Sequence, residues 1–163
     1  MYADETYYTS KYGGKTVPSA DFPRLSRKAA HMMDVVTGNK LRFAFPKIKA
    51  DTTAVKDCLC ELTDFLYNVE QYNATAMQGV GTVQQSDGTV RGKVVSSISS
   101  GSESVSYSVG GNTNSSISEA AKSEKALEEA VYRMTRMSLT GIRDANGVYL
   151  LYAGLTYPGK RGL

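Results

Sequence analysis

Tryptophan is absent from this chain of 163 residues, and histidine, cysteine and proline are scarce, with one, two and four copies. A metal site with one histidine would need several carboxylates converging on it, and nothing near His31 has that spacing. Cys58 and Cys60 lie two positions apart on a predicted helix. Side chains at that separation point about 200° apart, so the two thiols cannot readily form a disulfide. We therefore predict no catalytic, metal or cofactor residues, and a protein that is not an enzyme.

Two further absences bear on where the protein works. The N-terminus, Met1 to Glu5, lacks the basic and then apolar layout of a signal peptide. No apolar run approaches the ~20 residues that cross a bilayer. No disulfide framework is indicated, which fits a reducing cytosol. We expect a soluble intracellular protein with no membrane partner.

Apolar residues make up 41% of the chain, enough for one compact core that leaves part of the chain outside it. Four segments show helical apolar spacing or clear helix start and stop signals: 4–12, 22–36, 51–77 and 119–139. Residues 148–152 are a short strand-like run. The predicted fold is mainly α, a single domain over 1–163. It comprises a small bundle of three to four helices, a protruding Ser-rich β-hairpin or loop arm, and a short C-terminal strand.

The predicted arm covers about 78–118, between the last two long helices. It holds four charged residues, and eleven of the 23 residues in 96–118 are serine. That composition also suits a linker or a disordered loop. However, 94–98 and 105–109 are β-prone and partly alternating, which favours a hairpin. An isolated two-stranded hairpin is marginally stable in water, so such an arm needs a surface to lie against.

Charge is unevenly distributed along the chain. Residues 21–49 hold seven basic and two acidic groups, whereas 51–73 hold one basic and five acidic groups. Pairing of these two segments with each other is favoured over a role in steering a partner. Within the basic segment, Arg42, Lys47 and Lys49 are candidates for contact with the phosphates of double-stranded DNA. Phenylalanines interleave the segment, as they do in some single-strand binders. A solvated face explains the same residues equally well.

The order of the parts is more informative than any single residue. A Tyr-rich helix ends at Gly-Gly, the second predicted helix ends at 34–37 (Asp-Val-Val-Thr), and a Ser-rich stretch occupies 97–107. The last helix leads to 139–142 (Leu-Thr-Gly-Ile) and then to 152–155 (Tyr-Ala-Gly-Leu). This layout resembles the head-tail connector family of tailed bacteriophages, the head-completion adaptors that bind beneath the portal. The chain departs from the family pattern at Ala153, where arginine is usual, and in the length of 144–151.

The resemblance implies a structural virion protein without catalysis or cofactors. It would form a homo-oligomeric ring, expected to be a dodecamer, although the free chain is expected to be a monomer. The ring would dock under the portal protein and link the DNA-filled head to the next neck, stopper or tail protein, with double-stranded DNA passing through. Its location would be the virion neck, after synthesis in the bacterial cytoplasm.

The resemblance also implies roles for three groups of residues. The inter-subunit arm would use Val95, Ile98, Val105, Tyr107 and Val109. Docking to the portal or neck would use Tyr149, Leu151, Tyr152, Leu155 and Tyr157. The DNA channel would receive Arg42, Lys47 and Lys49. The alternative function is a small cytosolic helical binding module that contacts DNA non-specifically through the basic segment 24–49.

Overall fold

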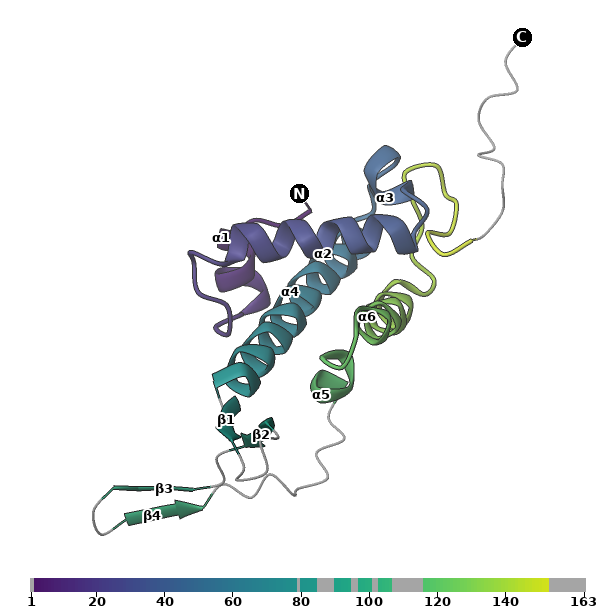
Figure 1. Ribbon diagram of the computed structural model, residues 1–163. Coiled ribbons are helices and arrows are strands. Elements are labelled where there is room, and N and C mark those ends of the chain that lie inside the picture. The colour runs from purple at the N-terminus through teal and green to yellow at the C-terminus, as the bar shows by residue number, and fades with distance from the viewer. Residues whose placement is uncertain are drawn as a thin grey trace. The chain divides into compact units, whose positions relative to one another are not determined.

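The computed structural model describes residues 2–78, 80–84, 90–94, 97–100, 103–106 and 116–152 (Figure 1). The described part is mainly helical. Its helices are α1 (Glu5–Tyr7), the π-helix η1 (Tyr8–Tyr12), α2 (Phe22–Val36), α3 (Lys40–Phe43), α4 (Lys49–Gln78), α5 (Ser116–Ala120) and α6 (Glu124–Leu139). The chain forms two compact units, Met1–Tyr67 with Glu128–Leu163, and Asn68–Leu127. In the described residues no helix is long and apolar enough to cross a bilayer.

The first unit is built on the helices whose apolar stripes the sequence predicted. Proline at the second position of α2 does not disrupt the helix, because an N–H group in the first turn has no carbonyl acceptor within the helix. Phe22, Leu25 and Met33 along one face of α2 have at most 1% of their surface exposed. The helix ends at Val36, and beyond it Gly38 and Asn39 have positive φ, which stops its continuation. This predicted helix is confirmed.

Helix α4 is buried on two faces rather than one. The predicted stripe is confirmed, since Leu59, Leu62 and Leu66 are almost fully inaccessible. Cys60, which lies off that stripe, is also fully buried, so a second face of α4 is covered as well. Burial raises the pKa of both cysteine thiols, Cys58 and Cys60, to about 12. Both therefore stay protonated and unreactive in the folded protein.

The N-terminal helix covers the second face of α4. The predicted helix at 4–12 is confirmed, although it continues as the π-helix η1, and Gly13 ends it in the left-handed conformation. Tyr8 is 1% exposed and its ring lies against the Cα of Gly14, where an added Cβ would sit 2.1 Å from the ring. Glycine at 14 is therefore required by this close approach.

The second unit, Asn68–Leu127, contains two antiparallel strand pairs. Strand β1 (Val80–Gln84) pairs with β2 (Val90–Val94), and β3 (Ser97–Ser100) pairs with β4 (Glu103–Ser106). Ile98 and Val105 are opposite each other in the β3–β4 register. Three other predicted arm residues, Val95, Tyr107 and Val109, lie outside the described residues.

Three of our sequence predictions are corrected by the structure. The predicted C-terminal strand at 148–152 is wrong, because this segment is a loop whose one described β-bridge joins Arg143 to Tyr149. The helix predicted over 119–139 is broken at 121–123, where Ser123 caps α6 by accepting from the Ala126 N–H at 3.1 Å. The helix α3 was not predicted. In the described part there are therefore six α-helices, three of them short, rather than three to four.

Candidate interaction surface

A buried lysine organises one end of the first unit. Lys40, the first residue of α3, is 9% exposed. Its ammonium donates to the carbonyl oxygens of Tyr149 at 3.2 Å, Leu150 at 3.3 Å and Tyr152. It also lies 5.6 Å from the centre of the Tyr152 ring. Three carbonyls match the three protons of an ammonium group, so Lys40 is satisfied without a carboxylate.

The loop 142–152 is shaped further by local hydrogen bonds. The carboxylate of Asp144, a buried residue, accepts from the N–H groups of Asn146 at 2.8 Å and Val148 at 2.9 Å, which turns the chain back. Ala145 donates its N–H to the Ala44 carbonyl at 3.0 Å, joining the loop to the residues after α3. In Figure 1 the loop accordingly runs beside α3.

We call α3, residues 44–49 and the loop 142–152 together the α3 end. Four large apolar or aromatic side chains of the α3 end face solvent: Phe43 (76% exposed), Ile48 (61%), Tyr149 (46%) and Tyr152 (60%). The guanidinium of Arg143 stacks 4.6 Å from the Tyr149 ring centre and donates to its hydroxyl at 2.7 Å. A surface that exposes aromatic rings beside cations is typical of protein interfaces.

The predicted basic residues belong to the same surface. Arg42, Lys47 and Lys49 are all exposed, and within the described residues none of them forms an ion pair. Arg42 lies close enough to Tyr2 for its charge to lower that tyrosine's pKa, against a larger rise caused by burial. Tyr2 stacks on Phe45 with ring centres 5.4 Å apart, so the N-terminus packs against the α3 end.

Three acidic residues of α4 in the first unit accept hydrogen bonds from hydroxyl groups and not from Arg42, Lys47 or Lys49. Tyr7 donates its hydroxyl to Asp57 at 2.8 Å, and Tyr8 donates to Asp64. Ser138 of α6 donates to Glu61 at 3.2 Å. For these three carboxylates, the predicted pairing with the basic segment is therefore wrong. The donors of these three bonds are neutral hydroxyls, so none of the bonds uses a cation of the α3 end.

Burial raises the pKa of Tyr7 and Tyr12, which both belong to the N-terminal segment, to about 12, and the hydrogen bond to Asp57 adds to the rise for Tyr7. A raised phenol pKa stabilises the fold fully below pH ~10, the unfolded value, and the contribution is lost as the pH approaches 12. We expect the N-terminal segment to detach between these limits. Ultraviolet absorbance of tyrosinate should show a late, cooperative step that vanishes in urea. Non-cooperative titration of all tyrosines near pH ~10 would contradict this.

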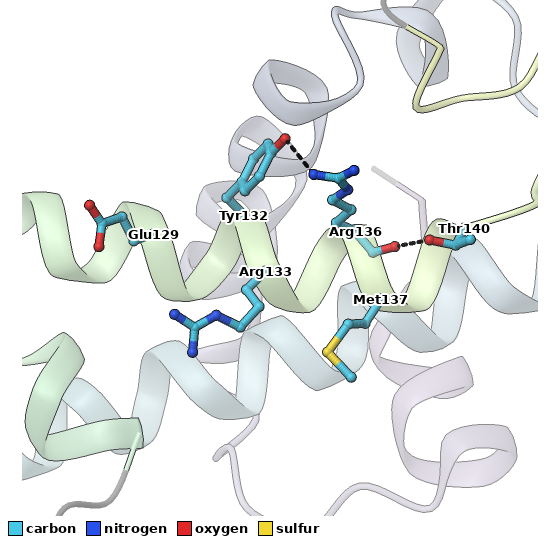
Figure 2. A pocket seen from close by; sticks show the side chains of 6 residues that line it. All are labelled: Glu129, Tyr132, Arg133, Arg136, Met137 and Thr140. Carbon is cyan, nitrogen blue, oxygen red and sulfur yellow. Dashed lines mark hydrogen bonds between the residues drawn. The ribbon is translucent and has the colours of Figure 1, made fainter.

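A second surface feature lies on α6. Figure 2 shows a shallow hollow whose lining residues all belong to α6 or its end: Glu129, Tyr132, Arg133, Arg136, Met137 and Thr140. The Arg136 guanidinium points toward the Tyr132 hydroxyl at 3.5 Å and lies 6.0 Å from the ring centre. Among the residues that the structure describes, one helix supplies the lining, so this part of the hollow has a single wall. It does not have the concave form of a small-molecule site.

The structure thus brings together residues that the sequence assigned to two separate roles. Tyr149 and Tyr152, predicted for docking, lie at the same end as Arg42, Lys47 and Lys49, predicted for DNA. Leu151 is half-buried in the loop, while Leu155 and Tyr157 lie outside the described residues. Lys40, which joins the two groups, was not predicted as a functional residue. Nothing in the sequence distinguishes it from the other lysines, because the short helix α3 that it begins was not predicted either.

The chemistry available at the α3 end is that of recognition: aromatic rings, exposed cations and a loop fixed by hydrogen bonds. In the described residues no three histidine, cysteine, aspartate or glutamate side chains gather as metal ligands would. No protein-family model, curated protein or solved structure is significantly similar to this chain.

Proposed function

We propose that this chain is a structural adaptor of a tailed bacteriophage, a head-tail connector that forms a ring beneath the portal and links the head to the neck. The observation that carries the proposal is the α3 end, where exposed Tyr149 and Tyr152 are held in a fixed loop beside exposed cations. A docking protein needs such a pre-shaped surface, because fixing the loop before contact lowers the entropy lost on binding.

The mainly helical fold and the order of its elements are in keeping with the connector resemblance. The paired strands of 80–106 have polar sequences, and we propose that they form an arm that lies against a neighbouring subunit. Strand addition uses backbone hydrogen bonds and so suits a Ser-rich segment. In a closed ring each edge would be covered by the next protomer.

DNA contact is the second candidate function. It is favoured by the exposure of Arg42, Lys47 and Lys49, which have no ion-pair partner among the described residues. Such contact would be to phosphates and independent of sequence. It is compatible with a ring around DNA and also with a free binding module.

Co-expression with the portal protein encoded in the same genome, followed by electron microscopy, tests the docking role. We expect a ring of this chain under the portal. Joint replacement of Tyr149 and Tyr152 by serine should abolish docking, whereas Tyr132→Ser, which changes a tyrosine of similar exposure on α6, should not. Absence of the chain from purified virions would overturn the proposal.

Deletion of 97–109 tests the arm. Because the helices of the first unit have their own core, we expect the helical circular dichroism to be retained while ring assembly is lost. Loss of the helical signal would show that these residues stabilise the fold, and retention of assembly would show that the arm is not an inter-subunit element.

A further inference from the structure

We propose that the α3 end binds an acidic, amphipathic segment of a partner protein. Carboxylates of that segment would lie against Arg42, Lys47 and Lys49, and its apolar side chains would cover Phe43 and Ile48. The inference rests on the proposed function and names the chemistry of the docking partner.

The apolar part of the surface sets the first requirement. Phe43 and Ile48 expose 76% and 61% of their surface, and both lie within a few residues of the cations. An aliphatic side chain such as Ile48 contributes favourable binding free energy only when its surface is removed from water, and this requires an apolar partner. The phosphates and sugars of a DNA duplex offer little such surface.

The cations set the second requirement. Lys47 and Lys49 lie at the N-terminus of α4, where the helix dipole is positive and basic residues are unfavourable. Neither of them, nor Arg42, is in an ion pair within the described residues. Their placement therefore works against the stability of α4, and a bound carboxylate would be attracted by the lysines and by the helix terminus together.

Only a segment with both apolar side chains and carboxylates can cover the apolar residues of the α3 end and also pair with its cations. A duplex would pair with the cations and leave Phe43 and Ile48 in water. A purely acidic chain would do the same. An amphipathic helix with apolar residues at i, i+3 and i+4 and carboxylates beside them would cover the rings and neutralise the cations in one contact.

Fluorescence anisotropy with three labelled probes tests this inference on the full chain. The first probe is a helical peptide of glutamates with leucines at i, i+3, i+4 and i+7, and the second replaces every leucine by serine. The third is a random DNA duplex of about 20 base pairs, two turns of B-form helix. We expect the leucine peptide to bind about tenfold more tightly than the serine peptide, because only it covers the apolar surface.

Matched variants locate the contact. Phe43→Ser should weaken the leucine peptide by about tenfold, and the pair Lys47→Gln with Lys49→Gln by about threefold to tenfold in a salt-dependent manner. Met137→Ser on α6, also 76% exposed, and Lys28→Gln on α2, also exposed, serve as controls and should change nothing. All the replaced side chains face solvent, so each variant is expected to fold.

Three results would overturn the inference: duplex binding at least as tight as the leucine peptide and insensitive to Phe43→Ser, equal binding of the two peptides, or no binding of any probe. Self-association that is lost in Phe43→Ser would assign the surface to a second copy and overturn it too. The peptide experiment needs no portal, so peptide binding by the free chain, together with no ring in the co-expression with the portal, would refute the connector and leave this inference standing.

Discussion

Replacing Lys40 with methionine is expected to free the loop 142–152. Methionine fills a similar volume, but the carbonyls of Tyr149, Leu150 and Tyr152 lose their charged donor. Hydrogen bonds to a charged group contribute about 1.5–3 kcal/mol, so we expect the free energy of unfolding to fall by about 3 kcal/mol. Chymotrypsin should then cleave after Tyr149 and Tyr152. The amide of Leu150, bonded to the Ile142 carbonyl at 3.0 Å, should exchange faster with solvent.

Two companion variants separate charge from geometry. Lys47→Met makes the same chemical change at an exposed site and should alter stability by less than ~0.5 kcal/mol. Lys40→Arg keeps the charge but offers a planar fork that does not suit three carbonyls around one point, so it should rescue only partly. If Lys40→Met and Lys47→Met were equally stable and equally resistant to chymotrypsin, the role assigned to Lys40 would be wrong.

Removing one hydroxyl from Tyr8 is expected to have the other large effect. In Tyr8→Phe the ring still packs on Gly14 and on Phe22, 4.9 Å away between centres. The hydroxyl, however, donates to Asp64 and accepts from the N–H groups of Thr16 at 3.2 Å and Val17 at 3.1 Å. Its loss leaves these groups without a partner, which should cost about 2–4 kcal/mol of unfolding free energy.

Tyr7→Phe is the matched control for Tyr8→Phe. Tyr7 is only half-buried, and its hydroxyl donates to Asp57 at 2.8 Å, so we expect a smaller cost of about 1 kcal/mol. Urea unfolding of both variants measures the difference. Equal costs would show that the Tyr8 hydroxyl is not the main attachment of the N-terminal segment to α4.

The helices α2 and α4 could be predicted from the sequence because each stripe of buried residues has helical spacing of its own. Leu25 on α2 and Leu62 on α4 are fully inaccessible, as their positions in the stripes indicate. The second buried face of α4, which contains Cys60, could not be predicted in this way. It is created by the N-terminal helix, whose attachment depends on tyrosine and aspartate residues about fifty positions apart.

The loop 142–152 shows a different limit. The pattern at 148–152 suits a strand, but a strand needs a partner strand for its carbonyls. Here three of those carbonyls accept hydrogen bonds from Lys40, the first residue of α3, which lies more than a hundred positions earlier in the sequence. Local propensity contains no information on such a contact, since tertiary context overrides it.

The same limit explains the candidate surface. Arg42, Lys47 and Lys49, and separately Tyr149 and Tyr152, could be selected from the sequence by residue type and motif. Their proximity could not, because it depends on Lys40 and on the bond between Ala145 and Ala44. The residue types of this surface could therefore be predicted from the sequence, whereas their proximity could be seen only in the folded chain.

The hydrogen bonds from tyrosine hydroxyls to Asp57 and Asp64 bear on the rate at which the protein associates with a charged partner. The donors are neutral hydroxyls, so these bonds bring no positive charge to the two acidic side chains, while the exposed cations Lys47 and Lys49 lie at or just before the first residue of α4. We expect this distribution of acidic and basic groups to give the first unit an electric dipole moment. A charged partner would orient it before contact, so its rate of association should depend on ionic strength far more steeply than its stability does.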